Sequence, residues 1–147
     1  LADYSFDIAV SQHVQMNVAD KARLYAEAHR VLVDGGRLAL WDITIGAKNA
    51  DLDYPVPWAD QPARSHLVTP DELRAVVESA GFAIEHWNDL TEQAAALMQA
   101  LLAQPAGPLG LHAFVTDFGR KAENLTRALA DGRLRAIQGV ARKITGG

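Results

Sequence analysis

The pattern of hydrophobic and polar positions predicts that strands and helices alternate along the first part of the chain. Residues 6–11 form a short apolar run with β-branched side chains, which is typical of a strand covered on both faces in a parallel sheet. Residues 19–33 place apolar side chains at helical spacing, and Gly35 and Gly36 end this helix before a second apolar strand at 37–43. Strand, helix and strand in this order form a βαβ unit, whose right-handed crossover makes the two strands parallel.

The alternation continues after a loop from 46 to 66, a length at which loops often serve as lids or binding segments. Thr69, Pro70 and Glu72 predict a helix start, with an N-cap, a proline in the first turn and a capping box, and the helix ends at Gly81. The remaining predicted elements are a strand at 82–87, helices at 91–104 and 116–130, and a strand at 133–144 in which Gly139 marks a bulge or a close approach. We therefore predict an α/β fold in a single domain over 1–147.

The composition narrows the classes of function. Of the 147 residues, 49% are hydrophobic and 22% are charged, as in one soluble globular domain. A formal net charge of -4 provides no basic surface for nucleic acid or an anionic membrane, and no apolar run reaches the roughly 18 residues of a membrane-spanning helix. Cysteine is absent, which excludes disulfides, thiolate metal sites and a cysteine nucleophile. We expect a cytoplasmic protein that binds no metal, nucleic acid or membrane.

Three stretches of sequence, taken in order, resemble a known family. Residues 5–11 (SFDIAVS), 27–32 (EAHRVL) and 35–42 (GGRLALWD) resemble the central strand, helix and strand of the class I S-adenosylmethionine-dependent methyltransferases. The helix start at 69–73 (TPDEL) and residues 80–82 (AGF) continue the match. The resemblance implies a Rossmann-like fold, S-adenosylmethionine as the cofactor and methyl transfer to a small-molecule acceptor.

Within that family, the chain resembles the carboxyl-terminal half of the fold. The resemblance implies that its strands are the fourth to the seventh, mostly parallel, with the seventh inserted antiparallel between the fifth and the sixth. The glycine-rich cofactor loop and the ribose-binding acidic residue of the family would lie before Leu1, and the sequence contains no Gly-x-Gly-x-x-Gly. We expect a fragment of a longer protein that binds S-adenosylmethionine weakly or not at all by itself.

The same resemblance makes a prediction about the strand at 6–11. In the family this strand is flanked by the first strand, so here its edge is predicted to be unpaired and apolar. Exposed strand edges pair readily with other chains. We expect this edge to be covered by a second copy in a homodimer or larger homo-oligomer, by a rearranged segment, or by a missing N-terminal half.

The loop at 11–18 is the best candidate for a binding site, because open α/β sheets bind ligands at the carboxyl ends of their strands. The resemblance implies that Ser11 and Gln12 contact the cofactor and that His13 faces the substrate. The loop also resembles that of phosphoethanolamine methyltransferases, which carry Asp in place of His13 and a catalytic His in place of Asn17. Both departures argue against that substrate. His13 is the one side chain of this loop with a basicity suited to accept a proton, unless it is a hydrogen-bonded loop histidine.

Four further residues are candidates for the site or for its frame. Asp42, at the end of the second strand, either orients an amine or hydroxyl as a catalytic group or caps a turn. Asn17, Trp58 and His66 are candidates for substrate contact, the latter two from the long loop, where packing within the loop is the alternative. Two other groups are expected to be structural: the histidines without metal-ligand spacing (His29, His86, His112) and the apolar residues of the core or an interface (Leu97, Met98, Leu101, Leu102).

Three functions remain open. The first is methyl transfer to a small molecule by the parent protein, and whether this chain is an enzyme by itself is left undecided. The second is a non-catalytic methyltransferase-like module that self-associates through its open sheet edge. The third, a nicotinamide-dependent oxidoreductase, would need a glycine fingerprint and a Tyr-Lys pair, which Tyr25 does not supply. The acidic and aromatic residues of 50–66 are compatible with a cationic or an apolar acceptor.

Overall fold

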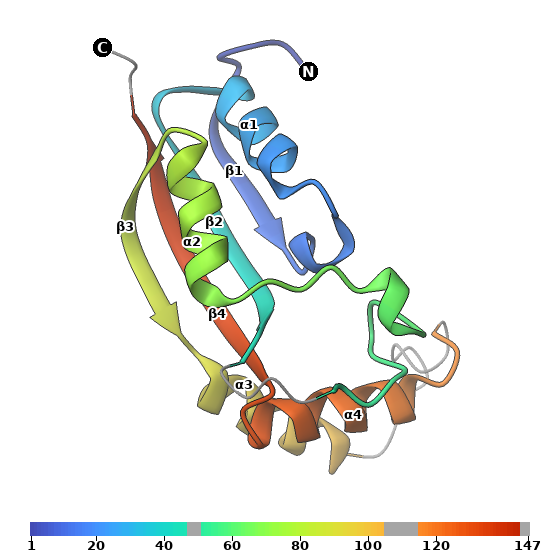
Figure 1. Cartoon of the computed structure of the whole chain (residues 1–147). Helices are drawn as coiled ribbons and strands as arrows, with labels where there is room; N and C mark the ends of the chain where they lie inside the picture. The colour runs from blue at the N-terminus through green and yellow to red at the C-terminus, as the bar shows by residue number, and fades with distance from the viewer. Residues whose placement is uncertain (47–50, 105–114, 145–147) are drawn as a thin grey trace.

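A mixed sheet of four strands organises the part of the chain that the computed structural model describes, residues 1–46, 51–104 and 115–144. The strands are β1 (Phe6–Gln12), β2 (Leu32–Ile45), β3 (Phe82–Asp89) and β4 (Leu134–Lys143). Their order in the sheet is β1-β2-β4-β3 (Figure 1). β1 pairs parallel with β2, and β4 pairs antiparallel with both β2 and β3. The predicted insertion of the last strand, antiparallel between its two predecessors, is confirmed.

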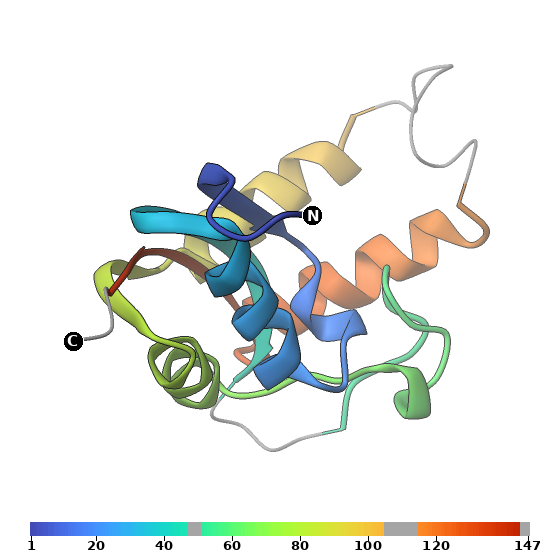
Figure 2. The ribbon, with the colours of Figure 1, turned by 90° about the horizontal axis from the view of Figure 1, so that it is seen from above.

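The helices cover one face of the sheet and one of its ends. α1 (Lys21–Val31) and α2 (Pro70–Ser79) lie side by side on one face, whereas α3 (Thr91–Leu102) and α4 (Phe118–Ala130) pack together near the end where β1 and β2 finish (Figures 1 and 2). Two short 3-10 turns, η1 (Gln15–Asn17) and η2 (Pro62–Arg64), lie in the connecting loops. In the described ranges no helix is long and apolar enough to cross a membrane.

The junction between α1 and β2 differs from the predicted one. β2 begins at Leu32, directly after α1, and not at residue 37. Gly35 has φ +73, and the register between β1 and β2 shifts between Phe6 and Ile8. A Cβ on Gly36 would lie 2.8 Å from the carbonyl oxygen of Val33. The two glycines therefore allow a bend within the start of the strand, where the sequence pattern predicted a separate turn.

The start of α2 follows the prediction in detail. Thr69 Oγ1 accepts a hydrogen bond from the backbone N–H of Glu72 at 3.2 Å, and Glu72 Oε2 accepts one from the backbone N–H of Thr69 at 2.8 Å. Both halves of a capping box are present, and Pro70 occupies the first turn. The helix ends at Ser79, two residues before Gly81, whose φ is +95.

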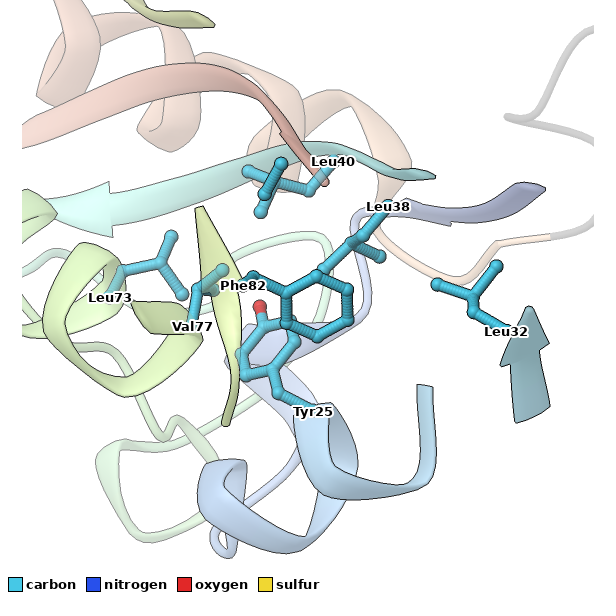
Figure 3. Close-up of a cluster of buried hydrophobic side chains, with 8 residues drawn as sticks. Tyr25, Leu32, Leu38, Leu40, Leu73, Val77 and Phe82 are labelled. Carbon is cyan, nitrogen blue, oxygen red and sulfur yellow. The ribbon is translucent and has the colours of Figure 1, made fainter. Parts of the chain in front are cut away.

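Two apolar clusters hold the layers together. The first lies between the sheet and the helices α1 and α2 (Figure 3), and its buried members are Tyr25, Leu32, Leu38, Leu40, Leu73, Val77, Phe82 and Ala141. The second joins the end of the sheet to α3 and α4, and its buried members are Met16, Ile43, Ala95, Ala128, Leu129, Leu134 and Ala136. At the other end of the sheet, the buried Lys143 Nζ donates to the carbonyl oxygens of His29 and Leu32, each at 2.8 Å, and so satisfies acceptors at the end of α1.

Gly139 marks a close approach, not a bulge. It pairs with Trp87 across β3 and β4, and a Cβ on Gly139 would lie 2.7 Å from Trp87 Cε3. The irregularity in this pair of strands lies instead in β3, between Ile84 and His86.

The prediction that the first strand is covered on both faces is wrong for the described residues. β1 lies at the edge of the sheet and pairs there with β2 alone. Ala9 packs against the first cluster, but Ile8 and Val10 are 61% and 74% exposed. The apolar run predicted burial because its composition matches that of a central strand. In the described part of the chain, however, no element covers the face of β1 that bears Ile8 and Val10. The predicted unpaired apolar edge is present.

Candidate functional site

A cavity of about 610 Å³ opens at the carboxyl ends of β1 and β2, between η1, the loop before α2, and the helices α3 and α4. We call it the strand-end cavity. Its lining residues are His13, Met16, Asn17, Ile43, Pro57, Trp58, Met98, Leu101, Leu102, Phe118, Ala122 and Leu125. Three residues that the sequence proposed, His13 and Asn17 from the loop at 11–18 and Trp58 from the long loop, meet here.

His13 is held in an unusual backbone conformation at the end of β1. Its φ is +53, in the left-handed region that few residues other than glycine adopt. Its backbone N–H donates to the carbonyl oxygen of Trp41 at 2.9 Å, which extends the pairing of β1 with β2 by one residue. Partial burial lowers the pKa of His13 below its ordinary value. The imidazole is therefore neutral at neutral pH and able to accept a proton.

Asp42 supports the turn that follows His13. Its side chain is fully buried on β2, and Oδ1 accepts hydrogen bonds from the backbone N–H groups of Val14 at 2.8 Å and of Gln15 at 3.2 Å. The Ser11 hydroxyl donates to Oδ2 at 3.4 Å. Burial raises the pKa of Asp42 to about 6, although these hydrogen bonds favour the charged form. Asp42 thus caps η1 from behind the cavity wall, and it is not among the lining residues.

Lys21 ties the long loop to the same turn. Its Nζ donates to the carbonyl oxygen of Val18 at 2.9 Å and to the carbonyl oxygen of His66. The backbone N–H of His66 in turn donates to the carbonyl oxygen of Met16 at 2.9 Å. Burial lowers the pKa of Lys21, while the charge of Asp42 opposes this shift. His66 therefore contributes its backbone to the frame of the site, and its side chain is not among those that line the cavity.

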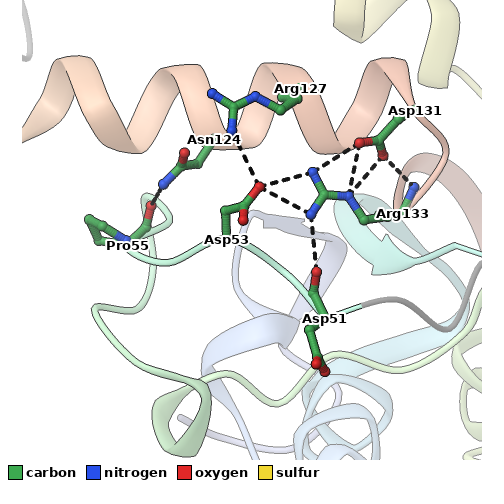
Figure 4. Close-up of polar contacts among 7 residues, drawn as sticks. All are labelled: Asp51, Asp53, Pro55, Asn124, Arg127, Asp131 and Arg133. Carbon is green, nitrogen blue, oxygen red and sulfur yellow. Dashed lines mark hydrogen bonds and ion pairs between the residues drawn. The ribbon is translucent and has the colours of Figure 1, made fainter.

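The loop that carries Trp58 forms a fixed wall of the cavity. Trp58 Nε1 donates to the Ser65 hydroxyl at 2.9 Å, which orients the indole ring. Asn124 Nδ2 on α4 donates to the carbonyl oxygen of Pro55 at 2.9 Å (Figure 4). Asp53 forms ion pairs with Arg127 at 3.3 Å and with Arg133 at 3.1 Å, as the same figure shows. Polar contacts thus join this loop, where the sequence predicted a lid or a binding segment, to α4 and to Arg133.

Ser11 and Gln12, the residues proposed for cofactor contact, lie outside the strand-end cavity. They border a smaller hollow of about 190 Å³, which also includes Trp41 and Gly139, on the surface of the sheet. His13, which follows them directly in the sequence, lines the strand-end cavity and not this hollow.

The apolar wall from α3 and α4 is the part of the site that sequence reasoning missed. Met98, Leu101 and Leu102 were expected in a core or an interface, yet they line the cavity together with Phe118 and Leu125. Their helical spacing shows only that they share a face, which does not distinguish packing from a ligand.

The remaining histidines and acidic residues give no sign of a metal centre. His29 packs edge-on against Phe82, His86 is exposed on β3, and His112 lies outside the described residues. In the ranges that the structure describes, no group of three or more His, Asp or Glu side chains is arranged to hold a metal ion.

Comparisons with known proteins identify relatives of similar sequence and fold. A family model described as "Methyltransferase domain" matches residues 1–40. Dimethylglycine N-methyltransferase of Parasynechococcus marenigrum (strain WH8102) is 29% identical over 92 residues, which are 63% of this chain and 32% of that protein.

Solved structures of similar fold extend the comparison over nearly the whole chain. Geranyl diphosphate C-methyltransferase from Streptomyces coelicolor A3(2) superposes with a TM-score of 0.74 at 14% identity, covering 97% of this chain and 48% of that one. A putative sarcosine dimethylglycine methyltransferase from Galdieria sulphuraria gives a TM-score of 0.65 at 18% identity, covering 98% and 55%. The chain thus spans about a third to a half of the length of these proteins. The fold is that of the class I methyltransferases, and the predicted resemblance is confirmed.

Proposed function

We propose that this chain is the acceptor-binding part of an S-adenosylmethionine-dependent methyltransferase and that the strand-end cavity holds a small-molecule acceptor. The observation that carries the proposal is a cavity at the carboxyl ends of β1 and β2, where His13 is the titratable side chain among the described lining residues. In open α/β sheets this end of the strands is where ligands bind. The similarity to methyltransferases that act on geranyl diphosphate and on dimethylglycine supports a small-molecule acceptor.

The residues present fit one end of S-adenosylmethionine. The Ser11 hydroxyl and the Gln12 amide are groups that hydrogen-bond a charged amino-acid moiety, and the two residues border one hollow on the surface of the sheet. Ribose hydroxyls are usually bound by a carboxylate with free oxygens, and Asp42 beside Ser11 already accepts hydrogen bonds from two backbone N–H groups. We therefore expect the 147-residue chain to bind the cofactor weakly or not at all.

The chain's own residues orient the acceptor and remove its proton. When bound, the cofactor supplies a methyl group on a sulfonium. The neutral imidazole of His13 would take the proton of the acceptor, which frees the acceptor's lone pair for the methyl group that the bound cofactor would supply. Asn17 offers a polar contact beside His13, and Trp58 forms an apolar wall. Asp42 and Lys21 are positioning residues, because they hold the backbone of η1 and do not line the cavity.

Two measurements test this function. Isothermal titration calorimetry of S-adenosylmethionine against the 147-residue chain should give a dissociation constant weaker than about 100 μM, and micromolar binding would contradict the expected partial site. Transfer of a labelled methyl group from S-adenosylmethionine should be detectable with the gene product that contains these residues. If that product binds the cofactor with micromolar affinity and transfers no methyl group to any of a broad set of small molecules, the proposal is wrong.

A second function is favoured by one observation, the exposure of Ile8 and Val10 on the edge strand. In this alternative the chain is a non-catalytic methyltransferase-like module that self-associates through β1. Sedimentation combined with a cofactor titration separates the two, since the module would associate and bind no cofactor in any form. In either case the cytoplasm is the location that we propose, and the absence of cysteine fits such a reducing compartment.

A further inference from the structure

We infer that the acceptor is an uncharged, hydrophobic molecule whose one essential polar group is a weakly acidic hydroxyl. This inference rests on the proposed function and names the substrate class of the same cavity. It is carried by the lining of the cavity, by its volume and by the state of His13.

The lining offers no counter-charge. Among its described residues none is Asp, Glu, Lys or Arg, and the polar side chains at the wall are those of His13 and Asn17. Lys121, on the same helix as Phe118 and Ala122, is paired with Asp60 at 2.9 Å. A charged acceptor would lose its water on entry without gaining an opposite charge, which is unfavourable. An uncharged acceptor has no such cost.

The volume also favours a hydrophobic molecule of moderate size. About 610 Å³ lies within the range of pockets that hold drug-sized ligands, roughly 300 to 1,000 Å³. A small zwitterion or a phosphorylated ethanolamine would leave most of the apolar wall from α3 and α4 unfilled. A hydrocarbon skeleton would bury Met98, Leu101 and Phe118, and burial of apolar surface is the favourable contribution that this wall provides.

His13 and Asp42 decide between an amine and a hydroxyl. An amine arrives at neutral pH as an ammonium ion and needs a carboxylate nearby, but the Asp42 carboxylate is fully buried and hydrogen-bonded to the backbone of η1. A phenol or enol arrives uncharged and presents one proton, which the neutral imidazole of His13 accepts. The new bond then forms at the hydroxyl oxygen.

Four naphthalene probes of nearly equal size test this inference by calorimetry on the 147-residue chain. They are 2-naphthol, 2-methoxynaphthalene, 2-naphthoate and 2-naphthylmethylammonium. We expect both neutral probes to bind at least about tenfold more tightly than both charged probes. We expect 2-naphthol to bind about threefold more tightly than the methoxy compound, because only the hydroxyl donates a hydrogen bond to His13. His13→Gly, which tolerates the left-handed backbone, should abolish that difference.

A matched pair of variants shows whether the probes occupy this cavity. Leu97 and Leu101 lie one turn apart on α3 and are 55% and 52% exposed, but Leu101 alone lines the cavity. Leu101→Gln should weaken the neutral probes about fivefold, whereas Leu97→Gln should change their affinity less than about twofold. Equal weakening by both variants, tighter binding of a charged probe, or no binding of any probe would overturn the inference. Cofactor is absent from these titrations, so their outcome is independent of the methyl-transfer assay.

Discussion

Oδ1 of Asp42 lies 2.8 Å from the backbone nitrogen of Val14, so a fully buried carboxylate on β2 holds the turn that follows His13. The same oxygen accepts a second N–H, that of Gln15, at 3.2 Å. The relationship explains why a charged group lies at the end of an apolar strand: it satisfies two backbone donors that η1 leaves unpaired.

Substitutions of Asp42 should separate the contribution of its hydrogen bonds to stability from that of its charge. Asp42→Asn keeps an oxygen for both N–H groups and should change the free energy of unfolding at pH 7 by less than about 1 kcal/mol, or increase it. Asp42→Ala leaves both donors buried and unpaired and should cost about 2 to 4 kcal/mol. Chemical denaturation of the three proteins measures these differences. A loss of more than 2 kcal/mol in the Asn variant would contradict the positioning role.

The pH dependence of stability follows from the same residue. Burial raises the pKa of Asp42 from 3.8 to about 6 in the folded protein, so the folded state holds this proton more tightly than the unfolded chain. The contribution is present in full below pH 3.8 and is lost as the pH rises through about 6, by roughly 3 kcal/mol at most. The denaturation midpoint of the wild-type chain should therefore include a decrease caused by Asp42 as the pH rises from 3.8 to above about 6. Asp42→Asn should remove it, and identical pH profiles of the two proteins would contradict the raised pKa.

His13→Asn tests the proposed proton acceptor. Asparagine tolerates the left-handed backbone at this position, so the fold should be retained, but an amide is not a base near neutral pH. In the gene product that contains these residues, methyl transfer should fall by about two to four orders of magnitude, and the acidic limb of the pH–rate profile should disappear. His86→Asn, at an exposed position on β3, is the matched control and should leave both unchanged. If His13→Asn keeps the wild-type pH profile, the histidine is structural.

The contact between Gly139 and Trp87 sets a strict size limit at the centre of the sheet. Gly139→Ala would bring a Cβ to 2.7 Å from the indole, and it should destabilise the chain by about 1 to 3 kcal/mol. Gly119→Ala is the control, because nothing lies within 4 Å of the added Cβ in α4, and it should stabilise by about 0.5 to 1 kcal/mol. Thermal unfolding followed by circular dichroism measures both. Equal effects would show that the Trp87 ring moves aside freely.

The edge strand predicts how the chain associates. Val10 is 74% exposed, so Val10→Lys should change the stability of the isolated chain by less than about 0.5 kcal/mol. It should nevertheless shift the sedimentation profile toward the monomer, because a charge on an exposed strand blocks edge pairing. Leu97→Lys, on α3 and 55% exposed, should leave the profile unchanged. A wild-type chain that is monomeric at high concentration would contradict association through β1.

Short sequence motifs and the family resemblance account for most of the fold features that the sequence predicted. The capping box of Thr69 and Glu72 depends on residues three apart, and the resemblance to a family implied the position of β4 in the sheet. The start of β2 was misplaced because a glycine pair after a helix normally marks a turn, whereas here the two glycines allow a bend within the strand and do not separate it from the helix. The exposure of β1 was also missed. The apolar composition of a strand shows that it is suited to packing against other elements, but it does not show whether those elements are there.

The candidate site was predictable only where it follows a strand end. His13, Asn17 and Asp42 lie directly after β1 or near the end of β2, and their proximity follows from the parallel pairing of these strands. Trp58 was found through its loop, but the contacts that fix this loop join residues far apart in the sequence, such as Asp53 and Arg133. The wall from α3 and α4 depends on how two helices dock against the end of the sheet, which no local pattern specifies.

The place of β4 has a consequence for the order of events during synthesis. It is the last of the four strands to leave the ribosome, yet β2 and β3 reach one another only through it. A nascent chain that lacks residues 134–143 can form the pair of β1 and β2 and no more of this sheet. Assembly of the sheet therefore waits for translation of the final strand, and until then the facing edges of β2 and β3 are open to pairing with other chains.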